Sequence, residues 1–146
     1  MKNKIIFILL FLFLASKSFA YLNSFQGKIT KVIDGDTLEV NTETKVRFAC
    51  VDAYESSVNK HLKMQMEKYN MTQEEVLKLG NEQKDFLKNY ENKRVKIFFD
   101  TSNRFDKYGR LLGVVVAVEE EGYFDVLNRG IKYYSNTFLC KQFLLD

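Results

Sequence analysis

The fold is decided by the segment from Phe25 to Cys50, which reads FQGKITKVIDGDTLEVNTETKVRFAC. Apolar and polar residues alternate in three short runs, and turn-forming residues separate the runs. Asp34-Gly35 predicts a two-residue hairpin turn after the first run, and a polar turn at 42–44 precedes the third. The core face of the third run carries Val46, Phe48 and Cys50. The segment therefore predicts three antiparallel strands.

The periodicity becomes helical between residues 56 and 92, where Thr72 and Glu75 form a candidate capping box for a second helix and Gly80 is a candidate interruption. Strands return at 95–99 and 111–118, and a short helix is predicted from Tyr123 to Asn128. This order, β-β-β-α-β-β-α, fits an α+β fold: a five-stranded OB-fold β-barrel with flanking helices. Other α+β sheets stay open on the pattern alone.

The first 20 residues have the pattern of a secretory signal. Lysines precede an apolar stretch from Ile5 to Ala15, and Ser18 and Ala20 provide the small residues of a cleavage site. An uncleaved anchor is the alternative, although the stretch is short for a membrane-spanning helix. We expect a signal peptide at 1–20, one mature domain at 21–146, and a periplasmic or secreted location.

The net charge of the chain is lower without this segment. The sequence has 22 Lys and Arg against 19 Asp and Glu, and three lysines lie in residues 1–20, so 22 − 3 = 19 basic residues remain and the net charge is zero. A general electrostatic attraction to nucleic acid is therefore excluded. The two cysteines, Cys50 and Cys140, would meet an oxidising compartment. We expect two unpaired apolar thiols, with a disulfide that pins the C-terminus as the alternative.

Three motifs carry residues suited to chemistry. The first, Ile33–Thr37 (IDGDT), places two carboxylates at a hairpin tip, where hard oxygen ligands suit Ca²⁺ or Mg²⁺. The second, Val46–Glu55 (VRFACVDAYE), places an arginine and two more carboxylates around the end of a strand. The third, Asp106–Gly113 (DKYGRLLG), delivers an arginine to the start of a buried strand. Each motif alone is also explained by turn formation or a solvated face.

Together, the motifs supply the groups that phosphodiester hydrolysis needs. An acid pair can bind a metal ion, and arginine forks match phosphate oxygens. A further carboxylate can accept a proton from water. Arg47 and Asp52 lie on opposite sides of an ideal strand, so their convergence requires the chain to bend where the strand ends.

The three motifs in series resemble the staphylococcal-nuclease-like (thermonuclease) family. The likeness extends from about Phe25 to Tyr134. It implies an OB-fold, Ca²⁺-dependent nuclease that cleaves DNA and RNA and leaves 3′-phosphate ends. It also implies a monomer without a stable protein partner. A non-catalytic OB-fold nucleic-acid-binding module is the alternative from a different functional class.

The resemblance assigns roles residue by residue. Asp36 and Asp52 match the calcium carboxylates, and Ala53 stands where the family uses a backbone carbonyl as a ligand. Glu55 matches the general base. The remaining assignments are two phosphate-binding arginines, two groove residues and a carboxylate behind the metal ligands: Arg47, Arg110, Lys107, Tyr108 and Asp34.

Two departures from the family pattern affect these expectations. Tyr54 stands where the family usually has a proline, which leaves the placement of Glu55 less constrained. The residues after Tyr134 are few, so the C-terminal helix of the family is expected to be abbreviated or missing, with Phe138, Leu139, Phe143 and Leu144 as its candidate core. His61, the one histidine, is expected to be a surface residue without a role.

Overall fold

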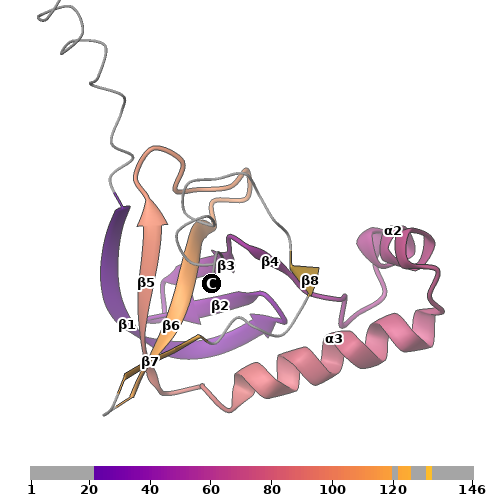
Figure 1. Cartoon of the computed structure of the whole chain (residues 1–146), viewed down its shortest axis with the longest axis horizontal. Helices are drawn as coiled ribbons and strands as arrows, with labels where there is room; N and C mark the ends of the chain where they lie inside the picture. Colours follow the sequence, from indigo (N-terminus) through magenta and orange to yellow (C-terminus); the bar gives the residue numbers. More distant parts are fainter. Residues whose placement is uncertain (1–21, 120–121, 126–130, 133–146) are drawn as a thin grey trace, which may run out of the picture.

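The computed structural model describes residues 22–119, 122–125 and 131–132 (Figure 1). The predicted signal peptide, the region of the abbreviated C-terminal helix and Cys140 lie outside these residues. The elements in chain order are β1 (Leu22–Asp34), β2 (Thr37–Val40), β3 (Thr44–Phe48), β4 (Val51–Asp52), α2 (Lys60–Tyr69), α3 (Gln73–Lys88), β5 (Arg94–Asp100), β6 (Leu111–Glu119), β7 (Gly122–Asp125) and β8 (Ile131–Lys132). Within the described ranges, no helix is long and apolar enough to cross a bilayer.

Five strands form a hydrogen-bonded ring, as the alternation in the sequence predicts. The main sheet runs in the order β3-β2-β1-β5-β6-β7, and an additional parallel pairing of β3 with β6 closes the ring of β3, β2, β1, β5 and β6, with β7 at the edge. The alternating apolar residues face inward and are buried, among them Ile29, Leu38, Val46, Ile97 and Val115. The predicted α+β fold of OB type is therefore confirmed.

The hairpin between β1 and β2 turns one residue later than predicted. Asp34 pairs with Thr37, so the two turn residues are Gly35 and Asp36. Gly35 is needed for space, because a Cβ atom there would lie 2.8 Å from the Cβ of Ala53. The shift places Asp36 at the tip, where it is only 9% exposed.

Two other predictions are wrong. The helix expected at Tyr123–Asn128 begins instead as strand β7, in which Tyr123 pairs with Val118 and Asp125 with Val116. Backbone pairing with the second edge of β6 overrides a short apolar pattern that fits either state; residues 126–128 lie outside the described part. Cys50, expected as a free thiol, is disulfide-bonded. It lies in the bend between β3 and β4 and is fully buried, and the one other cysteine of the sequence is Cys140.

The helical insert forms as predicted, with one exception that affects the site. Asn59 caps α2, and Thr72 with Glu75 forms the capping box of α3. Gly80 does not interrupt α3, which runs through it. A Cβ at Gly80 would lie 2.3 Å from the carbonyl oxygen of Glu55, so this glycine allows the helix and the segment before α2 to touch. Figure 1 shows α3 extending from the strands toward the right, with α2 above its far end.

Candidate functional site

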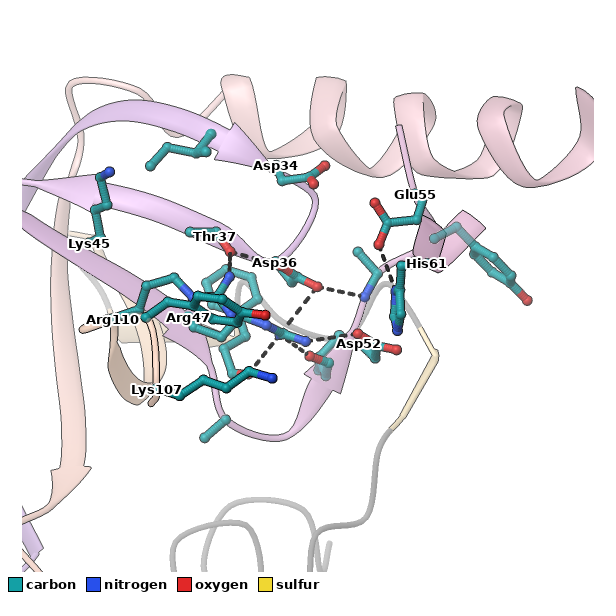
Figure 2. A pocket seen from close by; sticks show the side chains of 17 residues that line it. Asp34, Asp36, Thr37, Lys45, Arg47, Asp52, Glu55, His61, Lys107 and Arg110 are labelled. Carbon is teal, nitrogen blue, oxygen red and sulfur yellow. Dashed lines mark hydrogen bonds and ion pairs between the residues drawn. The ribbon is translucent and has the colours of Figure 1, made fainter. Parts of the chain in front are cut away.

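One cavity of about 730 Å³ collects every residue that the sequence nominates (Figure 2). The β1–β2 turn, the bend between β3 and β4, the segment before α2 and the turn before β6 all contribute to it. The nominated lining residues are Asp34, Asp36, Arg47, Asp52, Ala53, Glu55, Lys107, Tyr108 and Arg110. Three motifs that are separated in sequence therefore converge on one place.

Asp36 is the most buried acid of the site. Its Oδ2 atom accepts a hydrogen bond from the backbone N–H of Ala53 at 3.0 Å, and its Oδ1 atom accepts one from the hydroxyl of Thr37 at 2.9 Å. Burial raises the pKa of the Asp36 carboxyl, and the charge of Asp52 adds to this; Arg47 and the two hydrogen bonds oppose the rise. A second cation near this carboxylate would favour its charged form.

Arg47 holds the bend that the sequence required. Its Nη2 atom donates to Asp52 at 2.8 Å, and its Nη1 atom lies 3.2 Å from Oδ2 of Asp36. The same Nη1 atom donates to the carbonyls of Phe48 at 2.9 Å and Val51 at 2.7 Å. One guanidinium thus draws both predicted metal carboxylates together and fixes the backbone between them.

The oxygen donors at this point fit a calcium ion in kind. Two carboxylates share one arginine, which leaves one negative charge uncompensated in a mostly buried place. The Ala53 carbonyl is a third hard oxygen, and it also accepts a hydrogen bond from the Gln65 amide at 2.9 Å. Within the described residues, no three Asp, Glu, His or Cys side chains are grouped to hold a metal. Calcium takes about six to eight oxygens, so water or substrate oxygens would have to complete its shell.

Arg110 reaches the cavity from the turn before β6. Gly109 makes this turn with φ +74°, a conformation that favours glycine. Asp106 accepts hydrogen bonds from the backbone N–H of Arg110 at 3.0 Å and from its Nε atom at 2.7 Å. Burial raises the pKa of the Asp106 carboxyl. These bonds and one from the Tyr108 N–H lower the pKa by more than burial raises it, so the net pKa is below its usual value. Asp106 therefore orients Arg110 as a charged partner.

Arg110 also contacts the start of β2. Its Nη1 atom lies 3.3 Å from the hydroxyl of Thr37, the residue that also donates to Asp36. Its guanidinium lies 5.4 Å from the centroid of the Tyr108 ring, and the Lys107 ammonium lies 5.0 Å from the same ring. Tyr108 is 70% exposed, so these groups form an accessible basic and aromatic rim.

Glu55 lies across the cavity from Arg110, with the two predicted metal carboxylates between them (Figure 2). Its Oε1 atom is 2.8 Å from Nδ1 of His61, and its Oε2 atom accepts from the Asn59 amide at 2.6 Å. Its backbone N–H donates to Oε1 of Gln65 at 2.9 Å. All three partners come from the cap or the body of α2.

The segment around Glu55 is held without a proline. The Tyr54 ring packs edge-on against Tyr69 of α2, with centroids 5.9 Å apart. Gly80 of α3 admits the carbonyls of Tyr54 and Glu55 against the helix. Asp34 joins from the hairpin, because its Oδ1 atom accepts from the Ser56 hydroxyl at 2.7 Å. Contacts with other elements therefore supply the rigidity that the sequence left open at Tyr54.

Sequence reasoning missed several residues of this site. His61 and Lys45 line the cavity, and Gln65 is buried beneath it. His61, expected to have no role, contacts the proposed base instead. The signal was weak, because the Glu55–His61 contact depends on where α2 begins. The Asn59 cap was the one local clue.

Fold and site together define an OB-type domain with a cavity suited to a phosphate group, as in nucleic-acid-processing proteins. A family model described as staphylococcal nuclease homologue matches residues 45–130, more than half of the chain. This chain belongs to the staphylococcal nuclease family. The family supports a nuclease or nucleic-acid-binding function. No curated protein matches the chain.

Proposed function

We propose that this protein is an exported, calcium-dependent nuclease that hydrolyses phosphodiester bonds of DNA and RNA and leaves 3′-phosphate ends. The observation that carries the proposal is the convergence of two arginines, two metal-type carboxylates and a third, separately held carboxylate on one cavity. None of the five groups is missing, which favours an enzyme over a non-catalytic binding module of the same fold.

The residues divide the chemistry between them. Arg110 can bind the scissile phosphate, because Asp106 already fixes the direction of its guanidinium. Arg47 can add a second contact through its Nη2 atom, which now pairs with Asp52. Asp36, Asp52 and the Ala53 carbonyl would hold calcium, which supplies stabilisation of the charge that develops on the phosphate.

Glu55 takes the role of general base in this proposal. Its carboxylate can accept a proton from the attacking water, and it lies on the far side of Asp36 from Arg110 (Figure 2). Lys107 and Tyr108 form the exposed rim over which a nucleic-acid strand would pass. The proposal of export rests on the pattern of residues 1–20.

The direct test is cleavage of single-stranded DNA and of RNA by the purified protein in calcium or in EGTA. We expect cleavage in calcium alone and 3′-phosphate products. Glu55→Gln should reduce the rate by about 10²–10⁴-fold, the usual contribution of a general base. Glu74→Gln, at an exposed position of α3, is the matched control and should leave the rate unchanged.

Two outcomes would reject the proposal. Cleavage that persists in EGTA would remove the calcium dependence, and an undiminished rate for Glu55→Gln would remove the base. Binding of an oligonucleotide without turnover in Ca²⁺, Mg²⁺ or Mn²⁺ would instead establish the non-catalytic module. Export is tested separately, by fractionating cells that express the full chain and sequencing the N-terminus of the mature product.

A further inference from the structure

We propose that helix α2 positions the catalytic carboxylate, with His61 as the positioning residue that acts through Glu55. The inference rests on the proposed function and deepens it, because it assigns a role to the one histidine of the chain. The Nδ1 atom of His61 and the Oε1 atom of Glu55 lie 2.8 Å apart. The Glu55 side chain is 15% exposed, whereas the His61 side chain is 48% exposed.

The contact fixes which ring nitrogen carries a proton. A carboxylate only accepts hydrogen bonds, so Nδ1 of His61 must be the donor. The Nε2 atom is then free of a proton in the neutral ring. Because Nδ1 of His61 and Nδ2 of Asn59 each hold a different oxygen, the plane of the Glu55 carboxylate is set from both sides.

The start of α2 fixes both donors. The Asn59 Oδ1 atom accepts from the Leu62 N–H at 2.9 Å as the helix cap, which leaves its Nδ2 atom directed at Glu55. His61 follows two residues later in the first turn. That turn contains no acidic residue, so Glu55 supplies the negative charge that the positive end of the helix favours.

The same helix also holds the Glu55 backbone. Gln65, in the second turn of α2 and only 3% exposed, bridges the Ala53 carbonyl and the Glu55 N–H, both at 2.9 Å. The base is thus attached to α2 at three points, through one backbone group and both carboxylate oxygens. A base held in this way keeps one direction relative to a water beside the metal carboxylates, so His61 should affect turnover more than substrate binding.

A double-mutant cycle tests the role. We expect His61→Ala to lower kcat by about tenfold to a hundredfold, the range for a misplaced catalytic group, with KM little changed. His61→Gln retains a donor and should recover part of the loss. Lys63→Ala, on an exposed position of the same helix, should match the unsubstituted protein. In a Glu55→Ala background, His61→Ala should have no further effect, since the group it orients is gone.

Nuclear magnetic resonance supplies a readout without catalysis. In the purified protein, above the titration range of the imidazole, the ring nitrogens of His61 should show the proton on Nδ1. Glu55→Ala should release the ring to the Nε2-protonated form that a free histidine side chain prefers. An Nε2-protonated ring in the unsubstituted protein would overturn the inference.

The kinetic outcomes separate this inference from the proposed function. A nuclease whose His61→Ala variant is as fast or faster would overturn the positioning role and leave the nuclease standing. An equal loss from His61→Ala with and without Glu55 would show a purely structural role and also overturn it. A protein that cleaves nothing would reject both the nuclease and the catalytic role, and the resonance measurement would still decide whether the contact exists.

Discussion

Gly80→Ala is expected to lower both stability and activity, although a change from glycine to alanine inside a helix usually raises stability. In a helix interior, alanine is more favourable than glycine by about 0.5–1 kcal/mol. Here the new Cβ would lie 2.3 Å from the Glu55 carbonyl oxygen, 2.5 Å from its carbon and 2.7 Å from the Tyr54 carbonyl oxygen. All three atoms are backbone, so no side-chain rotation relieves the overlap.

The size of the effect follows from the displacement required. Ordinary contact begins near 3.4 Å, so the Glu55 carbonyl and α3 must separate by about 3.4 − 2.3 = 1.1 Å. Inserting a methyl group into a well-packed place costs about 1–3 kcal/mol, which exceeds the gain in helix propensity and leaves a net loss of about 0–2.5 kcal/mol. A displacement of about 1 Å at the base corresponds to a loss of up to about 10²-fold in kcat. Activity should therefore fall further than stability.

Urea unfolding and single-substrate kinetics measure the two effects on the same preparation. Lys78→Ala, at an exposed position of α3, is the control for helix propensity and should change neither. If Gly80→Ala raises the free energy of unfolding by about 1 kcal/mol, as an unconstrained helix position would, and retains full activity, the reasoning about close approach is refuted.

Four further outcomes are expected. Asp106→Asn should destabilise at neutral pH, because the folded pKa of Asp106 lies below its unfolded value of 3.8, and the difference in urea unfolding should vanish as pH falls through the folded pKa. In thermal melts, calcium at about 100 times its Kd should stabilise by about 2.7 kcal/mol. The stabilisation by calcium should be smaller in acid, because calcium binds the ionised form of Asp36. The pKa of Asp36 is raised in the folded protein, so its contribution to metal-free stability is fully present below the unfolded pKa and is lost as pH rises through the folded pKa. Cys50→Ser should lower the free energy of unfolding by about 2–5 kcal/mol, and an unchanged melt would deny the disulfide a role in stability. Oligonucleotide binding should require calcium, and the logarithm of the binding constant should fall with the logarithm of the salt concentration at a slope of only about −1 to −2. A steep slope in EGTA would contradict binding through the few basic residues of the cavity.

The parts of the site that are local in sequence could be predicted, and the parts set by packing could not. Each of the three motifs ends a strand or makes a turn, so alternation places it at the rim of the sheet and the nine nominated residues share one cavity. The close approach of Gly35 to Ala53 joins two segments that are distant in sequence. The hydrogen bond between His61 and Glu55 depends on where α2 begins and on where α3 holds that segment. These constraints are tertiary, and no single-sequence pattern contains them.

The charge of the cavity explains why this protein would need a metal ion to bind a phosphate. Four acidic side chains line it, Asp34, Asp36, Asp52 and Glu55, against four basic ones, Lys45, Arg47, Lys107 and Arg110. The lining therefore sums to zero, and Arg47 and Arg110 are each already paired with a carboxylate. A phosphodiester entering alone would compete with those pairs for the same guanidinium groups. A divalent cation on Asp36 and Asp52 would make the sum +2 and would compete with the Nη2 atom of Arg47 for Asp52, which frees that atom for the substrate. On this argument, calcium affects binding of the strand as well as the chemical step.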